Sequence, residues 1–141
     1  MPTVIELLTD DHRALERLFD AYASSHDSEI ALRLGDALVL HACVEEALLY
    51  PFVRTIYGAG ERLADEAEDD HERVKAFVAE AEDTRGAALD ELVSELRIDV
   101  GVHMRWEEED LFPWLAAVID APTLRRLGAR VTAFKGSQPV A

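Results

Sequence analysis

The sequence lacks the features that mark secreted and membrane-spanning proteins. Its 141 residues include one cysteine, Cys43, which excludes an intramolecular disulfide framework and favours a reducing compartment. No apolar run approaches the ~20 residues that a transmembrane helix requires. Residues 1–6 lack the basic start of a secretory signal peptide. We therefore predict a cytoplasmic protein that does not enter membranes.

Positive charge is also scarce. The chain has 14 Lys and Arg residues against 29 Asp and Glu residues, which gives a formal net charge of −15 at pH 7. A surface of this sign repels the phosphates of nucleic acids and of anionic lipids, so we predict that neither is a partner. Most of the acidic residues serve solubility. Acidic residues on apolar helix faces need a different explanation.

Alternating patterns typical of strands are missing, whereas apolar residues recur at steps of three and four, which predicts amphipathic helices. Short connections between long helices favour antiparallel packing. The predicted fold class is therefore all-α, an antiparallel up-down-up-down four-helix bundle with a short C-terminal helix. The four apolar stripes cover residues 4–23, 34–56, 64–81 and 89–114.

Several residues mark the ends and breaks of these helices. Thr3 begins a capping box for the first helix. Pro51 and Pro113 should kink the second and fourth helices, because proline has no amide donor. A break at 121–123 separates the bundle, about residues 3–120, from an accessory helix over about 123–135, and the tail is expected to fray from Gly136. We interpret residues 1–141 as a single domain.

Two motifs stand out within the stripes. His41-Ala-Cys-Val-Glu45 and His103-Met-Arg-Trp-Glu107 each place a histidine and a glutamate four residues apart, on one face of a helix. The other two helices each carry one histidine on the apolar stripe, His12 and His71, and both follow an Asp-Asp pair. The two halves of the chain therefore repeat the same order, which predicts a pseudo-twofold bundle with four histidines near one axis.

These donors predict a metal site. A buried, unpaired carboxylate costs several kcal/mol, so glutamates in a core are generally paired or bound to metal. A buried His–Glu hydrogen-bond network without metal is the alternative. Mixed imidazole and carboxylate donors suit iron, manganese or zinc better than calcium or magnesium. Two ions bridged by the two carboxylates fit both the number of donors and the symmetry. The six candidate ligands are His12, His41, Glu45, His71, His103 and Glu107.

In this order of motifs, H…HxxxE…H…HxxxE, the chain resembles the hemerythrin-like, histidine-histidine-glutamate cation-binding family over about residues 3–118. The resemblance implies two iron ions joined by an oxo or hydroxo bridge. It implies that one ion is held by His12 and His41 and the other by His71 and His103. The bridging carboxylates would be Glu45 and Glu107.

The sequence departs from the oxygen-carrying hemerythrins at Lys75, where those proteins have a further histidine. Their last carboxylate follows its histidine by five positions, so Glu108 is the alternative to Glu107, which repeats Glu45 and shares the apolar stripe. Loss of one ligand would leave an open position on both irons. This favours reaction with small oxidants or gases, namely H2O2, O2 or NO, in a catalase-like or stress-defence role. The alternatives are O2 binding, storage or sensing, and iron storage or delivery.

Other residues are interpreted as structural. His26 should lie on the surface, and Cys43 should be a packed free thiol. Tyr50 and Phe112 occupy matching positions before the two prolines, which suggests packing, although a phenol near iron could serve as a redox or gating group. The locally basic final helix is expected to pack on the acidic bundle.

Overall fold

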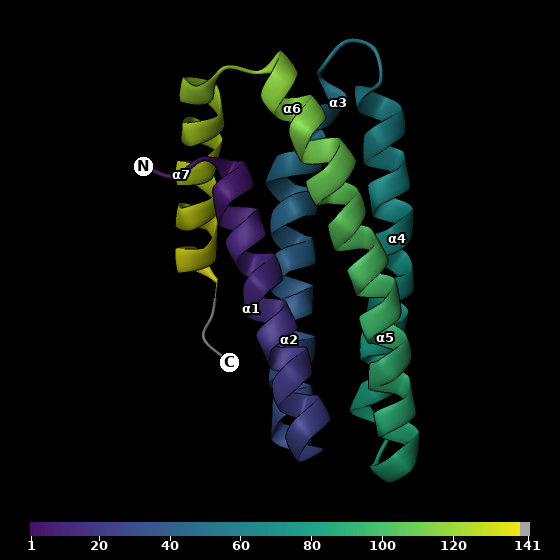
Figure 1. Cartoon of the computed structure of the whole chain (residues 1–141). Coiled ribbons are helices and arrows are strands. Elements are labelled where there is room, and N and C mark those ends of the chain that lie inside the picture. The colour runs from purple at the N-terminus through teal and green to yellow at the C-terminus, as the bar shows by residue number, and fades with distance from the viewer. Residues whose placement is uncertain (139–141) are drawn as a thin grey trace.

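The protein folds as an antiparallel bundle of helices, which confirms the predicted fold class (Figure 1). A computed structural model describes residues 1–138. Two π-helical turns interrupt the second and fourth of the four long helical segments of the bundle. They are η1 at Glu45–Leu49 and η2 at Glu107–Leu111. The α-helices are α1 (Val4–Ser25), α2 (Ser28–Val44), α3 (Tyr50–Arg54), α4 (Gly60–Glu82), α5 (Gly86–Trp106), α6 (Phe112–Val118) and α7 (Ala121–Ser137).

The elements form four rods, which are α1, α2 with η1 and α3, α4, and α5 with η2 and α6. The rods pack as two hairpins, and α7 lies outside them. Helices α1 and α2 lie side by side, as do α4 and α5, while α7 runs along the outer side of α1 (Figure 1). Helix α1 begins where the sequence predicts, because the Thr3 hydroxyl accepts a hydrogen bond of 3.2 Å from the backbone amide of Glu6. In the described part of the chain, no helix is long and apolar enough to span a membrane.

The two prolines do not act as simple kinks in continuous α-helices. Each follows a wide π-helical turn in which an amide bonds to the carbonyl oxygen five residues back, from Tyr50 to Glu45 and from Phe112 to Glu107. Pro51 and Pro113 then occupy the first turn of the next helical segment, where the missing amide donor costs little. Such turns often occur at functional sites, and here each begins at a motif glutamate.

The extra residue in each π-helical turn shifts the buried face by one position. The stripe predicted from constant periodicity continues through Phe52 in the second rod and Trp114 in the fourth, yet both of these are only partly buried. Val53 and Leu115 are fully buried instead. The predicted burial of Phe52 and Trp114 was wrong because a π turn changes the rotation about the helix axis from one residue to the next. This change turns residue 50 toward the core.

The C-terminal helix is longer than predicted. It begins at Ala121, because the Asp120 side chain accepts a hydrogen bond of 2.9 Å from the amide of Thr123 and so caps the first turn. The 121–123 segment was interpreted as a break, but Pro122 lies in that first turn, where proline is well tolerated. The helix continues to Ser137, beyond the predicted fraying point, and residues 139–141 of the predicted tail lie outside the described residues.

Two apolar clusters fill the bundle and leave a polar layer between them. One cluster lies near α3 and α6 and includes Leu8, and the other lies nearer the opposite end and includes Leu15. His12 falls between these two residues on α1 and has no exposed surface. Each of the other three rods likewise carries its motif histidine between residues of the two clusters.

Candidate metal centre

The structure brings all six predicted donors into this polar layer and buries every one of them. Each side chain comes from a position that the repeat places on the inner face of its rod. The two glutamates are completely buried, each at the first residue of a π-helical turn. The donors form two groups of three, in each of which one atom per residue lies within 4.8 Å of the others; these are His12, His41 and Glu107, and Glu45, His71 and His103.

The spacing within the groups suits a shared ion. Donors that each lie ~2.1 Å from one ion are themselves roughly 3–4 Å apart. The Nε2 atoms of His71 and His103 are 3.2 Å apart, and Oε1 of Glu45 lies 3.2 Å and 3.9 Å from them. In the other group, Nε2 of His12 lies 3.2 Å from Oε1 of Glu107.

Each glutamate also reaches the other group. Oε1 of Glu45 lies 3.0 Å from Nε2 of His41, and Oε1 of Glu107 lies 3.5 Å from Nε2 of His103. Both carboxylates therefore stand between the two sets of imidazoles, and this is the position that a bridging carboxylate requires.

Several buried donor atoms have no hydrogen-bond partner among the described residues. They are Nε2 of His41, both carboxylate oxygens of Glu45 and Nδ1 of His71. His41 and Glu45 are close, but the direction between them is not that of a hydrogen bond. A buried carboxylate without partners costs several kcal/mol, so a purely hydrogen-bonded network would be left incomplete. A bound cation satisfies Nε2 of His41 and the oxygens of Glu45, whereas Nδ1 of His71 faces outward. The inward-facing donors therefore fit a metal site.

In the metal-free protein, protons bound to the histidines supply the positive charge that metal ions would otherwise supply. Burial alone would lower the pKa of His41, but the charge of Glu45 and a hydrogen bond to Asp11 outweigh it and raise that pKa to about 10. The pKa of His103 is also raised to about 10, because the charge of Glu107 and a hydrogen bond to Asp70 outweigh burial. The site thus attracts positive charge strongly.

The comparison with known families agrees with this geometry. Residues 3–115 match the model of the hemerythrin HHE cation-binding domain. The chain belongs to this family. The two buried triads are accordingly a candidate binuclear site of the kind typical of hemerythrins. No curated protein and no solved structure matches the chain.

A ring of carboxylates surrounds the hemerythrin-type site and holds the outer nitrogens of the histidines. Nδ1 of His12 donates to Glu108 at 2.8 Å, that of His41 to Asp11 at 3.1 Å, and that of His103 to Asp70 at 3.1 Å. A carboxylate at Nδ1 fixes the imidazole so that the Nε2 lone pair faces inward, toward a metal.

The two outer aspartates were not identified from the sequence. Asp11 and Asp70 precede the lone histidines, but each bonds to the histidine of a neighbouring rod. The repeated Asp-Asp-His opening was the available signal, although it could not show which histidine each aspartate serves. Glu108 lies outside the two triads, at Nδ1 of His12, whereas Glu107 points inward to Nε2.

The fourth outer contact is weaker. Nδ1 of His71 lies 3.8 Å from Glu46, too far for a hydrogen bond, and the amine of Lys75 binds both oxygens of this carboxylate at 2.8 Å. Lys75, which replaces the further histidine of the oxygen carriers, therefore points to Glu46 and supplies no donor to either triad.

The two halves of the site also differ at positions 50 and 112. The Tyr50 hydroxyl lies 3.1 Å and 3.3 Å from the Nε2 atoms of His71 and His103 and donates to Oε2 of Glu107 at 3.0 Å. At the matching position, Phe112 stacks on His12 with 5.9 Å between ring centroids. Interpreting Tyr50 as a packing residue is thus incomplete, because its hydroxyl enters the site.

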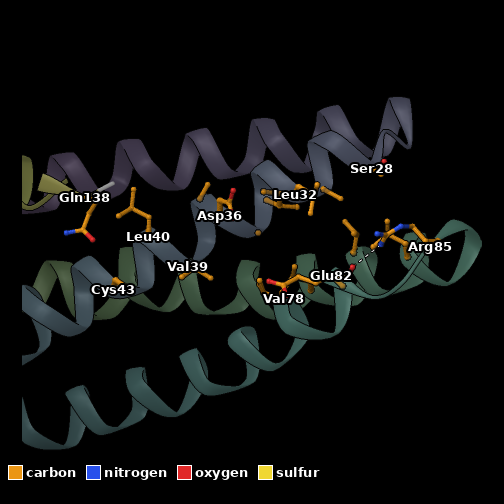
Figure 2. Close-up of a pocket in the computed structure, with 18 residues that line it drawn as sticks. Ser28, Leu32, Asp36, Val39, Leu40, Cys43, Val78, Glu82, Arg85 and Gln138 are labelled. Atoms are coloured by element: carbon orange, nitrogen blue, oxygen red, sulfur yellow. Dashed lines mark hydrogen bonds between the residues drawn. The ribbon is translucent and has the colours of Figure 1, made fainter. Parts of the chain in front are cut away.

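One cavity in the described part of the chain lies away from the site. It has a volume of about 580 Å³ and opens between α2, α4 and α5, with Cys43 toward one end and Arg85 toward the other (Figure 2). None of the six donors lines it, and its walls are mainly aliphatic. Cys43 is partly buried there, away from the triads, and His26 is exposed in the loop after α1, as predicted.

Proposed function

We propose that the protein is a non-haem di-iron protein that reacts with a small oxidant or gas, namely H2O2, O2 or NO, in defence against oxidative or nitrosative stress. The six ligands in this proposal are His12, His41, Glu45, His71, His103 and Glu107. The observation that carries it is the pair of buried triads whose carboxylates both reach the opposite set of imidazoles.

The donor set favours iron as the metal. Four imidazoles and two carboxylates suit iron or manganese, and they exceed the four ligands that one structural zinc takes. Two redox-active ions held here would pass two electrons to one H2O2, which becomes water, and would regain them from a second H2O2, which leaves as O2. The single cysteine, which favours a reducing compartment, agrees with action in the cytoplasm.

The surroundings limit what can react. Both glutamates and His12 have no exposed surface, and the apolar clusters lie above and below the layer. A cavity of about 120 Å³ reaches His41 between α1 and α2. Such a volume holds about four water molecules, so it favours a small molecule over a large organic substrate.

The side chain of Tyr50 lies where it can donate a proton within the site. Burial and then the charges of Glu107 and Glu45 raise the pKa of Tyr50 well above its usual value, so its oxygen keeps the proton in the metal-free protein. Reduction of peroxide or O2 consumes protons, and the Tyr50 hydroxyl is one buried proton donor that lies among the ligands.

The test is anaerobic loading of the purified protein with ferrous iron, followed by metal analysis, absorption spectroscopy and addition of H2O2. We expect two irons per chain and repeated consumption of H2O2 with release of one O2 for every two H2O2, because the assay contains no other reductant. The doubly substituted variant Glu45→Gln/Glu107→Gln should bind less iron and consume peroxide no faster than free iron does.

The alternatives give different results in the same assay. Reversible binding and release of unchanged O2, without peroxide turnover, would identify an oxygen-binding module. Rapid loss of iron to a weak chelator would indicate iron storage or delivery. A chain that takes up no metal from iron-supplemented medium would overturn the proposal.

A further inference from the structure

The C-terminal helix touches the site through one side chain. The Lys135 amine of α7 donates to both carboxylate oxygens of Asp11, at 2.6 Å each. Asp11 in turn accepts the hydrogen bond from Nδ1 of His41, whose Nε2 faces the triads. A continuous chain of polar contacts therefore runs from α7 to an inward-facing donor.

We propose that α7 contributes to the metal centre through Lys135. This lysine is a positioning residue that fixes the orientation of the His41 imidazole through Asp11. The inference rests on the proposed metal-binding function and goes beyond it, because α7 (Ala121–Ser137) lies outside the residues 3–115 that match the family. Nothing in the H…HxxxE repeat requires this helix.

Lys135 differs from the other cations around the site. Each of the four outer carboxylates pairs with one cation; the pairs are Glu108 with Arg13, Asp70 with Arg73, Glu46 with Lys75 and Asp11 with Lys135. Arg13, Arg73 and Lys75 belong to the bundle itself and have side chains 43%, 61% and 36% exposed, whereas Lys135 is 30% exposed. The contact from α7 is thus the one least screened by solvent.

Asp11 depends on this contact. The Lys135 amine donates to both of its carboxylate oxygens, and Nδ1 of His41 donates to one of them. A lysine that binds both oxygens also fixes the orientation of the carboxylate, and this orientation sets where Nδ1 of His41 must point. An outer partner of a ligand histidine acts on the metal in this way.

The same lysine lies in the wall of the cavity that leads to His41. That cavity is lined by Asp11, Lys135 and the aliphatic residues around them on α1 and α2. Helix α7 therefore both orients His41 and closes the side from which a small molecule would reach it.

Helix α7 packs closely against the backbone at the start of the chain. A Cβ atom at Gly128 would lie 2.5 Å from the backbone oxygen of Pro2 and 3.0 Å from the carbonyl carbon of Thr3. Only glycine allows the two backbones to approach so closely, and the approach places Lys135 two turns further along the helix, over Asp11. Position 128 thus controls the contact without touching the site.

The experiment compares Lys135→Met with Arg130→Met, which removes an exposed positive charge from the same helix. The first readout is made on the metal-free protein, where NMR of the imidazole nitrogens reports the hydrogen bond at Nδ1 of His41. The second is the rate at which the iron-loaded protein loses iron to a chelator, together with its absorption spectrum.

We expect Lys135→Met to shift the His41 nitrogen signals and to speed iron loss by roughly threefold to tenfold, less than direct loss of an outer partner causes. Asp11→Asn changes the outer partner itself, so it should shift the same signals and speed iron loss by more than Lys135→Met does. Lys135→Arg should restore the wild-type values, and Arg130→Met should leave them unchanged.

The two proposals fail in different ways. If Lys135→Met matches Arg130→Met in both readouts, the inference is overturned while the metal site stands. If the wild-type protein takes up no iron, the proposed function fails, and the His41 signals of the metal-free variants still decide whether Lys135 controls this histidine. A Gly128→Val variant that unseats α7 should shift the same signals as Lys135→Met, and unaltered signals would again count against the inference.

Discussion

The Tyr50 hydroxyl donates a hydrogen bond of 3.0 Å to Oε2 of Glu107, across the bundle from one rod to another. The contact gives one half of a nearly symmetric site a phenol, whereas the other half has the ring of Phe112 against His12. The symmetric repeat in the sequence thus supports a site with two unequal halves, and the difference can be tested by substitution.

Replacement of Tyr50 by phenylalanine should leave two metal ions bound but slow peroxide consumption by at least roughly tenfold, because a positioned proton donor is lost. Steady-state rates on iron-loaded protein measure this effect. Tyr57→Phe is the matched control, since Tyr57 is fully exposed in the loop before α4. Equal rates for the two variants would show that the phenol transfers no proton.

The Glu45→Gln substitution should reduce bound iron from two ions to at most one per chain. Glu45 approaches histidines of both triads, so its loss removes negative charge from both, and a neutral amide is a poor ligand. Metal analysis after gel filtration measures the result. Glu109→Gln, at an exposed glutamate of the other π turn, should retain both ions, and retention of both by Glu45→Gln would contradict a bridging role.

The metal-free protein should lose stability as pH rises from about 6.5 to about 10. The pKa values of His41 and His103 are about 10 in the folded state, above the ordinary value of 6.5 in the unfolded chain. The folded state therefore binds more protons between these values, and the stabilisation that is complete below pH 6.5 disappears as pH passes through the folded pKa. Thermal unfolding followed by circular dichroism measures this slope. His41→Gln should flatten it and His26→Gln, at an exposed histidine, should not.

Gly60→Ala should destabilise the protein by about 1–3 kcal/mol, because a Cβ atom there would lie 2.1 Å from the backbone oxygen of Val53. Gly136→Ala is the control, since a Cβ atom at this position in α7 meets nothing within 4 Å. It should stabilise the helix by about 0.5–1 kcal/mol. Urea unfolding of both variants gives the two values, and a neutral Gly60→Ala would mean that the loop between α3 and α4 shifts freely.

Much of the fold was predictable because the bundle is made of local signals. Apolar residues at steps of three and four fix the inner face of a helix, and short links between long helices leave antiparallel packing as the simple solution. The His-x-x-x-Glu spacing places its two donors on one face for the same reason. The cap at Thr3 and the exposure of His26 follow from neighbours within a few residues.

The predictions of burial were wrong where the periodicity of a helix changes part-way along it. Periodicity assumes a constant angle per residue, and the π turns at Glu45 and Glu107 add one residue to each of two rods. The buried face then shifts, so Val53 is fully buried while Phe52 is only partly so. The same shift carries the Tyr50 hydroxyl into the site.

The sequence by itself determined the helices, the family and the six donors that face inward, since each of these depends on spacing along one rod. Only the tertiary structure decided which aspartate holds which histidine, how Lys135 of α7 reaches Asp11, and why Tyr50 and Phe112 differ in role. Those contacts join residues far apart in the chain, and their geometry depends on the distances and rotations between packed helices. Spacing along a single helix carries no information about either quantity.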